Sequence, residues 1–229
     1  MLQRISIKLL SAVALLAMLA ACAGPVQRLD YTAFKRSQPK SILVLPPVNN
    51  TNDVKASFGV LSQVTQPLAE SGYYVVPVGP MEETFKYNGL TSPNDIAEVS
   101  PAKLREIFGA DSALYMTVTR YGTTYQVIDS VTAVSVSAKL VDLRTGDVLW
   151  TGSQSATDKE LGGMQGGVQG GGMVGLFVNL AQAAVKQIAK TVTDESVDVA
   201  GLTNAKLLSA GSPNGLLYGP RSPKYGTDY

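Results

Sequence analysis

The feature that most constrains the fold is a regular alternation of apolar and polar residues that begins near residue 133. The apolar set is Val134, Val136, Ala138 and Leu140, and the polar set between them is Ser135, Ser137 and Lys139. A period of two places these sets on opposite faces of a β-strand with one face buried. The letters RTGD (144–147) predict a hairpin turn, because Gly146 can adopt a positive φ. A return strand is expected from Val148, so this part of the chain predicts an antiparallel meander.

The preceding part of the chain predicts strands and helices in turn. The run SILVLPPVNN (41–50) is apolar until Pro46, which predicts a buried first strand that stops at the prolines. A helix is expected over 54–70, with Pro67 near its end, and a second buried strand over 73–78. The apolar stripe of that helix is Val54, Phe58, Leu61, Val64 and Leu68.

Two further helices and two further strands are expected before the hairpin. Pro80 opens a short helix, and Ser100 caps a second helix over 100–111 that ends at Gly109. A strand over 112–121, a turn at Gly122 and a long strand over 123–143 follow, and a helix is expected over 173–193. The fold class is therefore α/β with α+β character: a mixed sheet with a βαβα half followed by an antiparallel meander and a C-terminal helix.

The N-terminus resembles the signal of a bacterial lipoprotein. Arg4 and Lys8 precede an apolar run of about eleven residues, whereas a membrane span needs about 20. The letters LAAC (19–22) resemble a lipobox, which implies signal cleavage between Ala21 and Cys22 and acylation of Cys22, with palmitate among the acyl chains. The alternative is an ordinary signal peptide that ends in a cysteine by chance. Ala23 stands where an Asp would favour the inner membrane, so the outer membrane is expected.

These observations divide the chain into four parts. The expected boundaries are a signal peptide over 1–21, a lipidated tether over 22–40, an α/β domain over 41–195 and a flexible C-terminal tail over 196–229. The tether is polar and holds two prolines, and the tail shows no sustained hydrophobic period.

Composition removes several function classes. Cleavage takes Arg4 and Lys8 from 19 basic residues and leaves 17 against 18 acidic ones, so no basic excess points to nucleic acid. Cys22 is the only cysteine, so no disulfide is expected within the chain. The chain has no histidine, which excludes a Ser-His-Asp triad and removes the commonest zinc ligand. No metal and no cofactor are expected.

The glycine-rich run over 161–175 allows two interpretations. Gly163, Gly167, Gly171 and Gly175 recur at every fourth residue. On a helix they would form a smooth stripe for self-association or membrane contact. A flexible loop is favoured instead, because each glycine costs about 0.5–1 kcal/mol relative to alanine inside a helix.

Acidic residues give the one candidate for acid–base chemistry. Asp142 and Asp147 bracket the predicted hairpin turn, where aspartates commonly accept bonds from backbone amides. The alternative is a catalytic carboxylate pair. We favour the structural interpretation and expect no enzyme activity.

The order of these segments resembles a known group of domains. ILVLPPVNN, SGYYVVPV, LREIFGADSALYMTVTRYG and AKLVDLRTGDVLW follow one another. This order is similar to the α/β domain of the curli-secretion channel lipoprotein and the amino-terminal domain of the Tol-system propeller protein. With the lipobox and the glycine run, the chain most resembles the bacterial outer-membrane lipoproteins grouped as domain of unknown function 799. The resemblance covers about residues 40–195, and its motifs are structural.

The resemblance implies an envelope role rather than a reaction. The expected function is that of a lipid-anchored, periplasm-facing accessory or assembly component of an envelope transport or secretion complex. The expected partners are the membrane, through the lipid, a curli-channel-like lipoprotein or other envelope proteins, and further copies of the chain. The alternative is a periplasmic binding protein for a peptide, glycan or lipid.

Overall fold

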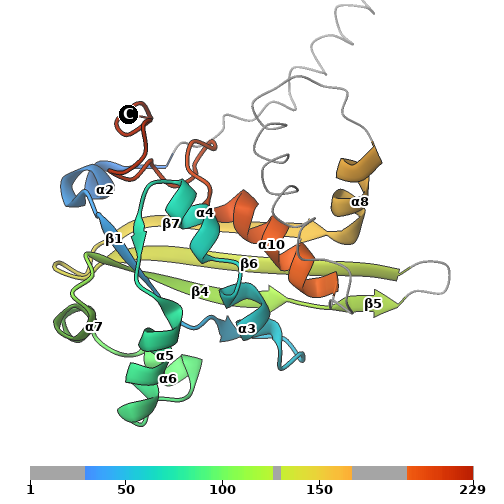
Figure 1. The fold of residues 1–229 in the computed structure, drawn as a ribbon, viewed down its shortest axis with the longest axis horizontal. Helices are drawn as coiled ribbons and strands as arrows, with labels where there is room; N and C mark the ends of the chain where they lie inside the picture. Colours follow the sequence, from blue (N-terminus) through green and yellow to red (C-terminus); the bar gives the residue numbers. More distant parts are fainter. Residues whose placement is uncertain (1–28, 126–129, 167–194, 229) are drawn as a thin grey trace, which may run out of the picture.

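The structure is a computed structural model, and it describes residues 29–125, 130–166 and 195–228. Its centre is one mixed sheet with the strand order β3-β1-β4-β6-β5, in which β2 also pairs with β4 and β7 with β6 (Figure 1). The strands are β1 Ser41–Val44, β2 Val48–Asn49, β3 Tyr74–Val75, β4 Ser112–Arg120, β5 Thr123–Tyr125, β6 Ser130–Asp142 and β7 Val148–Thr157. The predicted fold class is confirmed.

The parallel part of the sheet follows from the two prolines after β1. Leu43 of β1 pairs in parallel with Ala113 of β4, and Pro46 and Pro47 then interrupt the ladder because proline has no amide hydrogen to donate. The chain returns to β4 two residues later, where Val48 pairs with Thr117. β1 and β2 therefore act as two consecutive segments along the same edge of β4.

The antiparallel part confirms the alternating pattern. β6 pairs with β4 on one side and with β7 on the other, and Ser137 lies between Thr117 and Ser153. The four apolar residues at 134, 136, 138 and 140 are all buried. Gly146 has a φ of 81° in the turn between β6 and β7, as the hairpin requires.

Helices cover both faces of the sheet but not to the same extent. They are α2 Thr32–Ser37, α3 Ala56–Leu61, α4 Thr65–Glu70, α5 Val78–Tyr87, α6 Pro93–Ala97, α7 Pro101–Phe108, α8 Asp158–Gly166 and α10 Glu195–Leu208. The larger core lies on what we call the α10 face, where α2, α3, α4 and α10 meet the apolar side of β6. The smaller core, on the α7 face, lies between β1 and helices α5, α6 and α7.

Helix α7 shows how closely local signals can fix an element. The Ser100 side chain accepts a hydrogen bond from the Lys103 amide, and Pro101 occupies the first turn. Gly109 closes the helix in the left-handed conformation with a φ of 65°. Leu104 is fully buried. The predicted helix and both of its caps are confirmed.

Three predicted elements differ from the structure. The helix expected over 54–70 is divided into α3 and α4, and Val54 and Phe58 of its predicted stripe are 84% and 67% exposed. The strand expected over 73–78 pairs only at Tyr74 and Val75, since α5 begins at Val78. The long strand expected over 123–143 consists of β5 and β6, which pair with each other.

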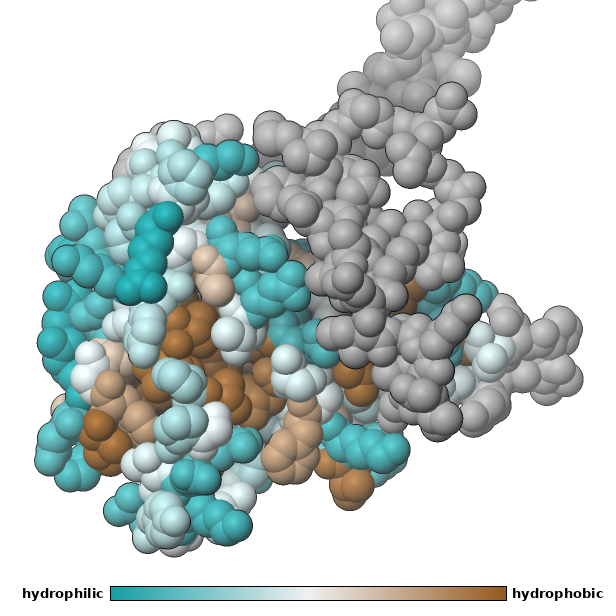
Figure 2. Space-filling view, viewed as in Figure 1, coloured by the Kyte–Doolittle hydropathy of each residue, from teal (hydrophilic) through white to brown (hydrophobic). Residues whose placement is uncertain are grey.

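The short strand β3 lies at an open edge of the sheet. Apolar surface gathers along it below α4 (Figure 2), where Val75, Val76 and Val78 are half-buried. Pro77 follows Val76 and has no amide hydrogen to donate to a further strand. A very short edge strand ended by proline is a common protection against unwanted strand pairing.

The flexible tail predicted over 196–229 is wrong for the residues that the structure describes. Residues 195–208 form α10, whose Val199, Ala200, Leu207 and Leu208 are buried against the sheet. The following segment also buries Leu216 and Leu217. Sequence periodicity missed this segment because it is held by backbone contacts: the Gly219 amide donates to Ser71 O and the Arg221 amide to Gly72 O.

The predicted boundary of the tether at residue 40 also needs correction. α2 lies within 22–40 and buries Phe34 in the larger core, so the folded part already includes these residues. A flexible loop was the favoured prediction for the glycine run over 161–175. The structure differs at its start, where Gly162 and Gly163 are part of α8, which ends at Gly166. The rest of that run and the helix expected over 173–193 lie outside the described residues.

One close contact leads to a test of the fold. Gly59 of α3 packs so tightly on Tyr121 that a β-carbon at 59 would lie 2.2 Å from the tyrosine hydroxyl. We expect Gly59→Ala to lower the free energy of unfolding by about 1–3 kcal/mol, as overpacking does. Urea denaturation of the wild type and the variant would measure this change.

Two further variants complete that test. Gly162→Ala places the same methyl group on α8, where nothing lies within 4 Å, and should not destabilise. Tyr121→Phe removes the hydroxyl and should return part of the stability that Gly59→Ala loses. Equal stability of Gly59→Ala and the wild type would contradict the close packing of Gly59 on Tyr121.

Candidate functional site

The residues that sequence analysis singled out for function lie mostly outside the described part of the chain. These are Ala21, Cys22, Gly167, Gly171 and Gly175. Gly163 is in α8. Lipidation, signal cleavage and glycine-mediated self-association therefore stay predictions. Within the described residues, the candidate site lies where the N-terminal segment joins the domain.

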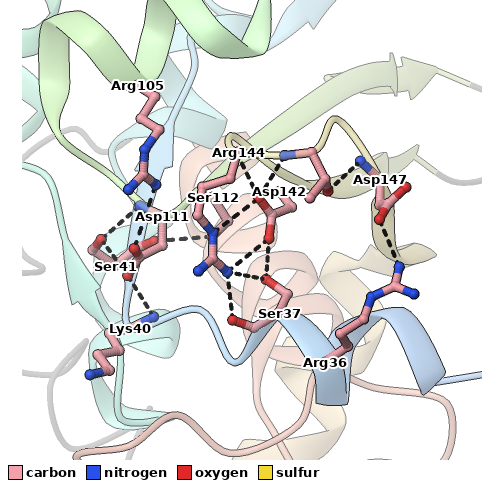
Figure 3. A network of polar contacts seen from close by, with 11 residues as sticks. Arg36, Ser37, Lys40, Ser41, Arg105, Asp111, Ser112, Asp142, Arg144 and Asp147 are labelled. Atoms are coloured by element: carbon pink, nitrogen blue, oxygen red, sulfur yellow. Dashed lines mark hydrogen bonds and ion pairs between the residues drawn. The ribbon is translucent and has the colours of Figure 1, made fainter.

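The centre of this site is the carboxylate of Asp142 at the end of β6 (Figure 3). Asp142 is only 1% exposed, so its charge needs partners. Arg144 donates from Nη2 to Oδ2 at 3.0 Å and from its backbone amide to Oδ1 at 2.6 Å. The Thr145 amide donates to Oδ1 at 3.1 Å, and the Ser37 hydroxyl donates to Oδ2. The carboxylate thus joins the hairpin to the last residue of α2.

These bonds keep Asp142 ionised. Burial alone would raise the pKa of the carboxyl, but the bonds from the Arg144 side chain, the Ser37 hydroxyl and the two amides outweigh it and lower the pKa to about 2. At neutral pH the group therefore has no proton to give. It is also a poor base, because a low pKa means a weak affinity for a proton.

A second contact supports the same junction. Arg36 Nη2 lies 2.8 Å from Asp147 Oδ2 on the far side of the hairpin turn. Arg144 Nη2 also donates to Ser37 O at 2.7 Å. The Arg36–Asp147 pair is exposed and therefore adds little stability. Most of the stability of this junction comes from the bonds of the buried Asp142. We call Arg36, Ser37, Asp142, Arg144 and Asp147 the tether clamp.

The start of β1 is fixed by a neighbouring group. Asp111 Oδ2 accepts from the Lys40 amide at 3.0 Å and from the Ser41 hydroxyl at 3.2 Å. The Asp111 amide donates back to Ser41 Oγ at 2.9 Å, and Arg105 Nη1 lies 3.9 Å from Asp111 Oδ1. The chain between α2 and β1 is therefore held at both ends (Figure 3).

The N-terminal segment is also bound to the segment after α10. The Leu29 amide donates to Asn214 Oδ1 at 3.0 Å, and the Tyr31 hydroxyl donates to Gly215 O at 2.6 Å. Trp150 Nε1 of β7 donates to Asn214 O at 3.0 Å. Residues 29–37 are thus fixed on two sides, by the hairpin and by the C-terminal segment.

The alternative of a catalytic carboxylate pair at 142 and 147 finds no support in this geometry. Each carboxylate is held by its own arginine. Within residues 29–125, 130–166 and 195–228, no three histidine, cysteine or acidic side chains lie in a group that could hold a metal ion. The same part of the chain has no helix with both the length and the hydropathy of a membrane span.

The second feature of the site is a part of the sheet that α5, α6 and α7 leave open. On the α7 face of β4, β6 and β7 we define the hydroxyl surface by its side chains: Thr117, Ser135, Ser137, Thr151, Ser153 and Ser155. Cross-strand register places Thr117, Ser137 and Ser153 in one row. Ser153 and Ser155 are exposed, and Lys139 Nζ lies 5.0 Å from the centre of the Tyr115 ring at the border.

Sequence analysis identified part of this site. The alternation indicated that Ser135, Ser137 and Lys139 lie opposite the core, and the hairpin motif placed Asp142 in a turn. It missed Arg36 and Ser37, because nothing local marks α2 as the partner of a turn more than a hundred residues away. The one available signal was Asp142 itself, an acidic residue at the end of a strand with an apolar face.

The clamp predicts a pH-dependent contribution to stability. Because the folded pKa of Asp142 lies below the ordinary 3.8, its contribution is fully present above about pH 4 and is lost as the pH falls towards 2. We expect Asp142→Asn to lower the free energy of unfolding by about 2–4 kcal/mol at neutral pH. The difference from the wild type should shrink below about pH 4. Urea denaturation across this pH range measures both.

Glu106→Gln is the matched control for this prediction. It removes one carboxylate from an exposed pair with Lys103 and should change stability by less than about 0.5 kcal/mol. A constant difference between wild type and Asp142→Asn at all pH values would show that the charge of Asp142 is not what stabilises the junction.

Comparison with known proteins places this fold in a family. Residues 29–221 match the family model described as "Putative lipoprotein GNA1162-like". The chain is 48% identical over 210 residues to "Putative lipoprotein NMB1124/NMB1162" of Neisseria meningitidis serogroup B (strain ATCC BAA-335 / MC58), covering 90% of this chain and 94% of that relative.

One solved structure supports this assignment. The crystal structure of lipoprotein GNA1162 from Neisseria meningitidis matches with a TM-score of 0.52 and 48% identity, over 67% of this chain and 100% of that chain. A PelC dodecamer from Paraburkholderia phytofirmans matches with a TM-score of 0.41 and 17% identity, over 74% and 86% of the two chains, a likeness too distant to indicate function. The expected lipoprotein family is thus confirmed, and the chain belongs to the GNA1162-like lipoproteins.

Proposed function

We propose that this chain is a lipid-anchored lipoprotein of the outer membrane that faces the periplasm. In this proposal it is not an enzyme but an accessory or assembly component of an envelope transport or secretion complex. The lipid on Cys22 holds the chain at the membrane, and several acyl chains make such anchoring stable. The folded domain then presents a surface to other envelope proteins or to further copies of itself.

The observation that carries this proposal is the hydroxyl surface. Helices α5, α6 and α7 pack on the α7 face near β1 but leave Thr151, Ser153 and Ser155 exposed. Hydroxyl groups both donate and accept hydrogen bonds, so such a surface can pair with many polar partners without burying an unpaired charge. Paired strands run on both sides of Ser137, with Thr117 on one neighbour and Ser153 on the other, so this part of the sheet offers a rigid area for assembly.

The tether clamp supports the same proposal by limiting how far the domain can move. From Cys22 to Leu29 the chain spans seven residues, which reach at most about 25 Å when fully extended. The tether first expected over 22–40 would have reached about 60 Å. Because α2 is bonded to the hairpin, the lipid would hold the domain by one defined end.

The alternative function is a periplasmic binding protein for a peptide, glycan or lipid. A lipid or apolar peptide calls for an enclosed apolar pocket. The cavity beside Tyr115 and Lys139 measures only about 150 Å³. A larger cleft of about 620 Å³ is polar and open. This cleft favours a polar ligand.

Detergent extraction with affinity capture tests the proposal. Wild-type lipoprotein from membranes should run as a discrete oligomer or bring down a channel-like lipoprotein, detected by native sizing and mass spectrometry. Cys22→Ala should be soluble and lose these partners. Ser153→Arg should stay in the membrane but lose them, because a bulky cation then stands in the middle of the hydroxyl surface.

Ala69→Arg is the control for a bulky cation at another exposed position. It lies on α4, on the α10 face, and should keep the partners of the wild type. A wild-type chain that runs as a monomer without partners would overturn the proposed function.

A further inference from the structure

An open cleft lies where the parallel strands end. It has a volume of about 620 Å³, within the range of ligand sites in proteins. One wall is the segment 50–54, which follows β2, and the other is the segment 119–123 at the end of β4. Neither wall belongs to the tether clamp or to the hydroxyl surface.

The position of the cleft follows from the topology. The connection from β1 to β3 runs through α3 and α4 on the α10 face, and the connection from β3 to β4 runs through α5, α6 and α7 on the α7 face. The chain leaves the carboxyl end of β2 towards β3 on one side of the sheet, and leaves the carboxyl end of β4 towards β5 and β6 on the other side. The carboxyl ends of β2 and β4 thus form a topological switch point, where open α/β sheets commonly bind ligands.

The first wall is rigid before any ligand arrives. Asn49 Oδ1 accepts from the Thr51 amide at 2.8 Å and from the Thr51 hydroxyl at 2.7 Å, and Asn49 Nδ2 donates to Asp53 O at 2.8 Å. The Asn50 amide donates to Val118 O at 2.9 Å, which fixes the wall to β4. A preformed wall loses little conformational entropy on binding.

The side chains that line the cleft have hydrogen-bonding capacity to spare. Asn50 and Asn52 are exposed, and the side-chain carboxamide of neither one bonds to another described residue. Asp53 Oδ1 accepts from the Lys55 amide, while Oδ2 lies 3.8 Å from the position of a β-carbon on Gly122 and so faces the opposite wall. Arg120 contributes the balancing positive charge.

We propose that this cleft binds a saccharide, and specifically a neutral oligosaccharide segment. Primary amides, a carboxylate and a guanidinium are planar groups that bind neighbouring hydroxyls of a sugar in pairs. One acidic and one basic side chain give the lining no net charge, which suits a neutral ligand. The open shape admits a chain that continues beyond the cleft. The inference does not depend on the proposed assembly role.

The lining argues against the other ligand classes. An extended peptide needs apolar pockets for its side chains, and Val54 is the one exposed aliphatic side chain in the lining. A lipid needs an enclosed apolar volume, which this cleft lacks. A strongly anionic ligand would meet Asp53 beside its single cation.

Nuclear magnetic resonance titration tests the proposal directly. The probes are chitotriose and maltotriose, both neutral, added to the complete mature chain with Cys22→Ala. We expect shifts of backbone amides within 50–54 and 119–123 that saturate with a millimolar dissociation constant for at least one sugar. The double variant Asn50→Ala/Asn52→Ala should weaken that binding roughly tenfold or more, which is about 1.4 kcal/mol.

Asn94→Ala is the matched control, since it removes one exposed amide from α6 and should change the affinity less than about twofold. The double variant replaces two exposed side chains without described bonds, so its spectrum should remain that of a folded protein. Three outcomes overturn the proposal: no shift with either sugar at about 10 mM, shifts elsewhere on the domain, or shifts at the cleft with trialanine but with neither sugar.

Discussion

The structure depends on the two-sided pairing of β4. On one side β4 accepts β1 and β2 in parallel, and on the other it pairs with β6 in antiparallel register from Ser112 to Arg120. No other strand in the described residues pairs in parallel on one edge and in antiparallel on the other. The α/β half and the meander therefore share one sheet only through β4, and its apolar residues Leu114, Met116 and Val118 are buried in the larger core.

This arrangement explains which elements could be predicted from sequence. α7 was predictable because a cap, a proline and a glycine all act within a few residues, and the β6–β7 hairpin because its period and turn agree. The length of β3 was not predictable from its apolar residues, because the strand is ended by Pro77 and by the start of α5 at Val78. In the predicted helix over 54–70, Val54 lies before α3 and Phe58 lies within α3, and both are exposed, which a helical stripe alone cannot foresee.

The largest error concerned the ends of the chain, and its cause is general. The segment after α10 has no hydrophobic period, yet Tyr73 donates from its hydroxyl to Leu217 O and the Ala210 amide donates to Ser71 Oγ. Each of these contacts joins two residues that are about 140 positions apart in the sequence, so no local sequence pattern predicts them. The same holds for Ser37 and Asp142 in the candidate site: the hairpin was predictable, and its partner was not.

The clamp and the cleft lie at opposite ends of the same strand. Ser112, at the start of β4, pairs with Asp142 of the clamp, whereas Thr119 and Arg120 at its end line the cleft. Eight residues of strand at about 3.3 Å each separate them by about 26 Å. Under the proposed function, a tether of seven residues would hold the clamp end near the lipid, and the cleft would point away from that end. In that arrangement, a site at the free end would remain accessible to a ligand while the opposite end carried the membrane attachment.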